Sequence, residues 1–166
     1  MSLDNSQLPP FLIGQLYKNS IVDLESVPLT PKSLKSQGLI FLGKNEKQVV
    51  IVVNTEHAVH LPDDDLNFLT GVLTACKLTL SDCAVVNCNS NTGLSYKMII
   101  EQFKPATLIC LGIKLSALAF PLEFPNYQVQ KYNGQSYLSA PSLGILAADK
   151  LEKQQLWTCL KKIFSI

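Results

Sequence analysis

Charged side chains and long apolar runs are both scarce in this sequence of 166 residues. Charged residues make up 16% of the chain and the net charge is +1, so the composition predicts no strong direct binding of nucleic acid. No apolar run approaches the ~20 residues of a membrane span, and the first ten residues are polar, unlike a secretory leader. We therefore expect a cytoplasmic protein without a membrane partner.

The common motifs of catalysis are missing as well. The eight glycines are scattered and form neither a phosphate-binding loop nor the elbow of a hydrolase nucleophile. The five cysteines include no C-x-x-C pair, which argues against a zinc site or a disulfide framework. His57 and His60 lack an obvious third ligand, and the three aspartates at 63–65 suit the positive end of a helix better than a catalytic cluster. The sequence thus predicts no metal, no cofactor and no catalytic residue.

Short apolar runs are what the chain does contain. Residues 49–53, 84–86 and 107–111 are apolar at nearly every position, which predicts strands buried on both faces. A hairpin-type turn at Asn133-Gly134 predicts that the extended stretch 135–139 pairs with the residues before it. Strands of the first kind belong to parallel sheets covered by helices.

Helical patterns separate these strands. One helix is predicted to begin at Pro62, a second to be capped by Asn91 or Thr92, and the last to begin with a capping box made by Asp149 and Glu152. The alternation of strand and helix predicts the α/β class, as a three-layer α/β/α sandwich with a central, mostly parallel sheet.

The chain divides into two parts by composition. Residues 1–38 are predicted to hold a short helix from about residue 6 to 18 and a Pro/Ser-rich linker, and residues 39–166 a single α/β/α domain. The helix carries an apolar stripe that suits helix-in-groove recognition, although it would equally suit packing on the core. The stripe consists of Leu8, Phe11, Leu12, Leu16 and Tyr17.

Polar residues follow the ends of the predicted strands. Ligands of open α/β sheets bind outside the carboxyl ends of the strands, so these residues define a candidate strand-end crevice. They are Asn54, Thr55, Glu56, Asn87, Pro141 and Ser142.

In order and spacing, these segments resemble the uracil-DNA glycosylase superfamily over about residues 48–164. Residues 50–57 resemble its first strand and water-activating loop, residues 84–89 the strand ending in the Asn that reads uracil, and residues 139–143 its His-Pro-Ser segment. The resemblance implies a glycosylase-like fold, with Asn87 in the base-reading position.

The chain departs from that superfamily at the positions that carry chemistry. Residues 54–57 lack the Gly and Pro that shape the water-activating loop, so Glu56 would hold its water in a different place. Ala140 stands where the superfamily has the His that stabilises the departing base. The departures predict a glycosylase-like frame without glycosylase activity.

Within this fold group the chain is similar to the psi-subunit family of the bacterial replicative DNA polymerase. The similarity covers residues 49–53 with 61–63, residues 66–73, and residues 138–143 with Leu156-Trp157. It implies a non-catalytic adaptor whose N-terminal peptide docks on the clamp loader and whose body binds a chi-like subunit. The docking residues would be those of the stripe that begins at Leu8.

Three functions remain open from the sequence. The first is this adaptor of the replication machinery. The second is a divergent DNA glycosylase that uses Glu56 to orient water and Asn87 to read the base. The third is a small-ligand-binding module that uses the strand-end crevice.

Overall fold

A computed structural model describes residues 38–56 and 58–166, and the chain from Gly38 to Ile166 forms one compact unit. The predicted N-terminal helix and linker lie outside the described residues, so they stay predictions. The same is true of the docking stripe Leu8, Phe11, Leu12, Leu16 and Tyr17.

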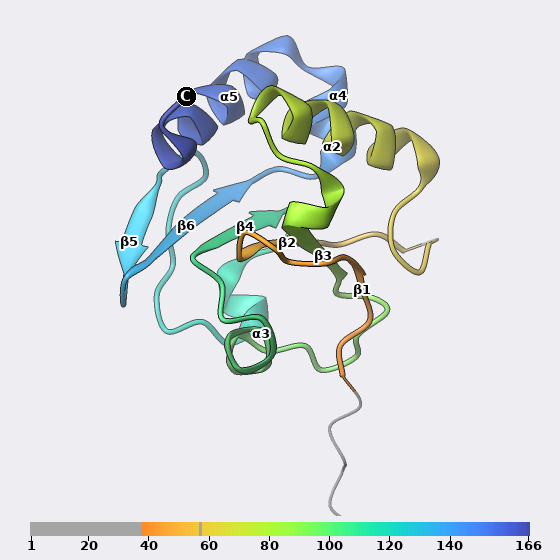
Figure 1. Cartoon of the computed structure of the whole chain (residues 1–166), viewed down its shortest axis with the longest axis vertical. Helices are drawn as coiled ribbons and strands as arrows, with labels where there is room; N and C mark the ends of the chain where they lie inside the picture. Colours follow the sequence, from red (N-terminus) through yellow and green to blue (C-terminus); the bar gives the residue numbers. More distant parts are fainter. Residues whose placement is uncertain (1–37, 57) are drawn as a thin grey trace, which may run out of the picture. The chain divides into compact units, whose positions relative to one another are not determined.

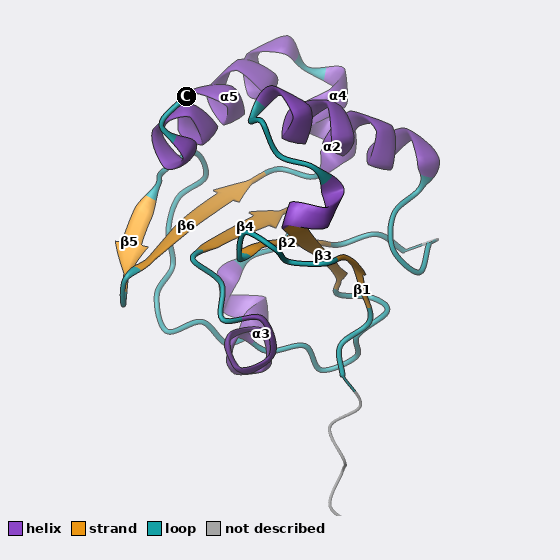
Figure 2. Ribbon diagram, in the orientation of Figure 1, coloured by secondary structure: helices purple, strands orange, loops and turns teal. Residues whose placement is uncertain are grey.

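The described part of the chain belongs to the α/β class, as the sequence predicts (Figure 2). It contains six strands, four α-helices and two short 3₁₀ turns (η). In chain order the elements are β1 (Phe41–Gly43), β2 (Val49–Val53), α2 (Asp63–Ala75), η1 (Leu80–Asp82), β3 (Cys83–Asn87), α3 (Tyr96–Phe103), β4 (Thr107–Leu111), η2 (Leu115–Leu118), β5 (Gln130–Tyr132), β6 (Gln135–Ala140), α4 (Leu143–Ala148) and α5 (Lys150–Phe164).

The strands form one mixed sheet in the order β1-β3-β2-β4-β6-β5. The four central strands are parallel, and the short edge strands β1 and β5 pair antiparallel with their neighbours. The register pairs Val53 with both Asn87 and Leu111, and Leu111 with Ala140. The carboxyl ends of all four central strands therefore meet along one edge, called here the carboxyl edge.

Alternate residues of the central strands pack on opposite faces of the sheet. In β2, Ile51 lies in a core with α2, α4 and α5, whereas Val50 and Val52 lie in a second core with α3 and η2. Figure 1 shows α2, α4 and α5 on one side of the sheet and α3 on the other. Burying one Val side chain contributes about 1.5–3 kcal/mol, which explains why nearly every position of β2, β3 and β4 is apolar.

The start of α3 differs from the prediction. Its N-cap is Ser95, whose hydroxyl accepts a hydrogen bond from the Met98 N–H, and neither Asn91 nor Thr92 caps the helix. The Asn91 amide instead bonds both the N–H and the carbonyl of Ile40. Asn91 thus anchors the segment leading into β1, a contact that local sequence does not indicate.

The C-terminal helices also differ in part. Asp149 caps α5 by accepting from the Leu151 N–H at 2.7 Å, as predicted, but Glu152 does not complete a capping box. Its carboxylate accepts a hydrogen bond from the Tyr127 hydroxyl instead. The six-residue helix α4 was not predicted, because so short a segment shows no clear helical period.

The turn between β5 and β6 confirms the predicted hairpin. Asn133 and Gly134 both have positive φ, 50° and 76°, as a type I′ turn requires.

Candidate functional site

The residues of the predicted strand-end crevice all lie at or beside the carboxyl edge, but the structure places them in two separate groups. At the ends of β2 and β3, the Thr55 backbone is bonded to the Asn87 side chain, and the Asn54 side chain accepts a hydrogen bond from Asn89. Pro141 and Ser142 follow β6 and lie beside Gly112, at the end of β4. Glu56 and Pro141 line two different hollows, so the six predicted residues do not form one crevice.

Asn87 is fully buried and is bonded on both sides of its side-chain amide. Its carbonyl oxygen accepts from the N–H groups of Thr55 at 3.1 Å and Asn89 at 3.2 Å. Its amide nitrogen donates to the carbonyls of Thr55 at 2.9 Å and Ala58 at 2.8 Å. Since an amide side chain has two N–H donors and one carbonyl oxygen with two lone pairs, its bonding capacity is fully used. Asn87 therefore holds the loop after β2 in place.

Glu56 occupies a different environment. It is exposed on the loop after β2, where an open hollow of about 330 Å³ lies against the loop after β3. Neighbouring Asn54 is also exposed, and its side-chain carbonyl accepts from the amide of Asn89 at 3.0 Å. A general base works within hydrogen-bond reach of a held water or substrate, and this hollow is too open to confine one. Its lining residues are Glu56, Ala58, Val59, Asn89 and Ser90.

Close packing closes the other half of the carboxyl edge. Gly112 has a φ of +72°, and a Cβ atom added there would lie 2.8 Å from the Cβ of Ser142. The Gly112 N–H also donates to the Ala140 carbonyl at 2.9 Å. The end of β4 is therefore in direct contact with the residues that begin α4, and a hollow of about 130 Å³ lies beside Pro141.

The cysteines are unsuited to nucleophilic chemistry. Cys76, Cys110 and Cys159 are buried, as predicted, and so is Cys83. Burial raises the pKa of the Cys83 and Cys110 thiols to about 12, and that of half-buried Cys88 to about 11. Because the thiolate is the reactive form, these groups are inert near neutral pH.

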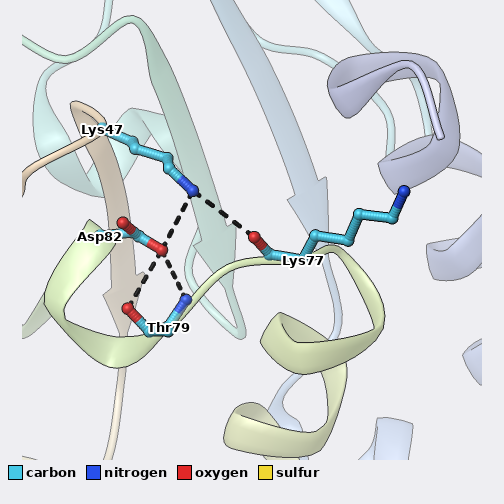
Figure 3. A network of polar contacts seen from close by, with 4 residues as sticks. All are labelled: Lys47, Lys77, Thr79 and Asp82. Atoms are coloured by element: carbon cyan, nitrogen blue, oxygen red, sulfur yellow. Dashed lines mark hydrogen bonds and ion pairs between the residues drawn. The ribbon is translucent and has the colours of Figure 1, made fainter.

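An ionic network lies at the opposite end of β2 and β3, before the strands begin (Figure 3). The Asp82 carboxylate accepts from the Thr79 N–H at 2.7 Å, the Thr79 hydroxyl at 3.1 Å and the Lys47 ammonium at 3.3 Å. The Thr79 N–H, followed by Lys47, holds the pKa of Asp82 below its ordinary value. Lys47 also donates to the Lys77 carbonyl at 3.5 Å. The network ties the segments before β2 and β3 to the end of α2, and this structural role accounts for its charges.

The largest hollow of the described surface that we identify lies between α2 and α5, and sequence reasoning missed it. This α2–α5 groove has a volume of about 770 Å³. Phe68, Val72 and Trp157 are only partly buried there. The signal in the sequence was a second apolar stripe on α2, one residue before the core stripe of Leu69 and Leu73. The lining residues are Asn67, Phe68, Gly71, Val72, Ala75, Lys150, Lys153, Gln154, Leu156, Trp157 and Leu160.

The described residues contain neither a candidate metal site nor a candidate membrane span. Within 38–56 and 58–166, no set of three or more His, Cys, Asp or Glu side chains is arranged to hold a metal ion. The same residues include no helix with the length and apolar character needed to cross a membrane. His57, considered in the sequence as a metal ligand, lies outside them.

No protein-family model matches the chain, and no curated protein is significantly similar to it.

Proposed function

We propose that this protein is a non-catalytic adaptor of the DNA replication machinery, with a three-layer, uracil-DNA glycosylase-like fold that resembles the psi-subunit family. In this role it links the clamp loader to a chi-like subunit or another replication protein. The main support for the proposal is that the Asn87 side chain makes all of its hydrogen bonds within the chain. The side chain that would read a base in a glycosylase is bonded to Thr55, Ala58 and Asn89 of its own chain.

Two further positions support a binding role over base excision. Glu56, the substitute for the water-activating carboxylate, is exposed beside an open hollow. Ala140, which stands in place of the catalytic His, is buried and carries only a methyl group, which cannot stabilise the negative charge of a departing base. Excision requires preorganised polar groups at all of these positions, whereas an adaptor requires only the frame.

The balance of charge does not favour DNA as a direct partner. All 14 basic side chains of the chain are lysines, and 13 acidic side chains nearly balance them. The chain therefore lacks the bidentate guanidinium contacts that favour binding to a phosphate backbone.

The proposal is tested by affinity purification from host lysate with the full chain as bait. We expect clamp-loader and chi-like proteins to be retained, and retention of the clamp loader to be lost in Leu12→Asp within the predicted docking stripe. Ser33→Asp, in the predicted linker, makes the same charge change and should retain it. Failure to recover any replication protein would contradict the adaptor function.

A parallel assay measures base release from DNA containing uracil or hypoxanthine. We expect no release by the purified chain. Release that is lost in Glu56→Gln would establish the glycosylase alternative.

A further inference from the structure

The α2–α5 groove combines an apolar floor with open space. Leu156 and Leu160 of α5 are buried beneath it, and Phe68 and Trp157 stand partly exposed beside it. Both helices pack against α4, which holds them on the same side of the sheet (Figure 1). An apolar groove on a preformed helical frame suits a partner that brings its own apolar side chains.

The helix α2 presents small residues to this groove. Gly71 and Ala75 lie one turn apart among its lining residues. A Cβ atom added at Gly71 would meet no atom within 4 Å, so the space above the helix backbone is empty. Small residues on a helix face allow the side chains of a docked segment to approach the backbone closely.

The charges that line the groove have one sign. Its charged lining residues are Lys150 and Lys153, both on α5. The Lys153 ammonium lies 5.4 Å from the centre of the Phe68 ring, so it is held over the apolar surface. Ammonium groups placed beside an apolar floor favour a partner with carboxylates flanking its apolar side chains.

We infer that the α2–α5 groove is the docking site for an acidic amphipathic helix of a partner protein. The apolar face of that helix packs between Phe68 and Trp157, and carboxylates at its margin pair with Lys150 and Lys153. Partly buried aromatic side chains near the centre of an interface commonly dominate its affinity, which assigns the main contact to Trp157. This inference rests on the proposed adaptor function and names the surface of the body that would serve it.

Trp157 offers a direct readout, because it is the only tryptophan of the chain. A display library of helix-forming, tryptophan-free peptides of about 16 residues is selected on the full chain at about 50 mM salt. The recovered peptides are synthesised and titrated while Trp157 emission is recorded. We expect Leu, Ile or Phe at helical spacing with flanking Asp or Glu, a blue shift of Trp157, and weaker binding at high salt.

Matched variants locate the binding. Gly71→Glu places a carboxylate in the empty space of the groove and should weaken peptide binding by about tenfold or more, which is about 1.4 kcal/mol. Gly144→Glu makes the same charge change on α4, where an added Cβ also meets nothing within 4 Å, and should leave binding unchanged. Lys153→Gln should weaken binding more than Lys161→Gln, because Lys161 lies on α5 outside the groove.

Recovery of no peptide, of peptides without acidic residues, or of peptides that bind Gly71→Glu as well as the parent chain would overturn the inference. So would a groove filled only by a small apolar molecule or by a second copy of the chain.

The affinity purification separates this inference from the proposed function. Replication proteins retained equally by Gly71→Glu would leave the adaptor function standing and exclude this surface. Peptide binding in the groove without any retained replication protein would contradict the adaptor function and leave the groove as a binding site for an acidic helix.

Discussion

The carboxyl edge and the α2–α5 groove differ in how far their side chains find partners within the chain. At the carboxyl edge the buried amide of Asn87 is bonded to its own chain, and Gly112 packs directly on Ser142. In the groove, Phe68 and Trp157 are partly exposed and the space above Gly71 is empty. Asn87 and Gly112 therefore make their contacts within the chain, whereas the groove has apolar surface and open space that a partner can cover.

This difference bears on what each region can do. Catalysis needs polar groups whose hydrogen bonds are completed by substrate, and binding to a protein needs apolar surface that a partner covers. An α/β sheet ordinarily binds its ligand at this edge. Here Asn87 and Gly112 use the edge to hold the neighbouring loops in place. The surface with capacity for a partner lies on the helices.

Replacing Asn87 gives the largest effect that we expect. Asn87→Ala removes the partners of the Thr55 N–H and of the Thr55 and Ala58 carbonyls, which should lower the free energy of unfolding by about 3 kcal/mol. Urea unfolding followed by circular dichroism measures the loss. Asn89→Ala, at an exposed position, should change stability by less than about 0.5 kcal/mol. A nearly neutral Asn87→Ala would mean that the side chain is kept for a ligand and would remove the contrast between the two regions.

The close packing of Gly112 on Ser142 is tested by replacing the glycine with alanine, which adds one carbon atom. Gly112→Ala should destabilise the fold by about 2–3 kcal/mol, because it combines strain at positive φ with a clash against Ser142. Gly134→Ala is a matched control, because its φ of +76° is similar but no atom lies within 4 Å of the added Cβ. Its cost should be about 1–2 kcal/mol, from strain alone. Equal losses for the two variants in urea unfolding would show that this part of the edge has room for a ligand.

Replacing a glycine with alanine in the groove should have the opposite effect on the stability of the fold. Gly71→Ala lies inside α2 with open space around the added Cβ, so it should stabilise the fold by about 0.5–1 kcal/mol. The gain comes from reduced backbone entropy in the unfolded chain. A thermal unfolding midpoint that falls in this variant would mean that the groove is closed around Gly71.

A smaller effect is expected from Asp82, at the other end of the same strands. Its pKa lies below the ordinary value of 3.8, so the stabilisation it provides is present above that pH and is lost as the pH falls through the lowered pKa. Asp82→Asn should therefore destabilise the fold near neutral pH, and the difference from the parent chain should shrink below about pH 4. Urea unfolding across this range measures it.

The variant Lys47→Met tests which neighbouring group lowers the pKa of Asp82 most. Because the Thr79 N–H lowers the pKa of Asp82 more than Lys47 does, most of the pH dependence should remain in this variant. Its complete loss would assign the effect to the lysine.

Local patterns in the sequence were sufficient for the strands and the hairpin. A run such as Val49–Val53, apolar at every position, can be satisfied only between two covering layers, and Asn133-Gly134 favours one turn type without help from the rest of the chain. The sequence predicts the central strands β2, β3 and β4 nearly to the residue, because their causes lie within a few residues of them.

The polar side chains behaved differently, because their partners are distant in the chain. Asn91 bonds Ile40, and Glu152 bonds Tyr127. Both side chains suit a helix cap locally, and each finds its partner in a segment that the sequence does not place beside it. The buried state of Asn87 depends in the same way on the loop containing Thr55 and Ala58.

Hydrophobic periodicity alone was enough to specify an α/β chain whose central strands end in polar residues, since burial on one or two faces leaves a regular mark on neighbouring positions. The packing of loops that are remote in sequence decided whether those polar side chains face an open site or bond to their own chain. The groove likewise exists because α2 and α5 lie on the same side of the sheet with Gly71 and Trp157 both lining the space between them, and no local pattern encodes the distance between two helices.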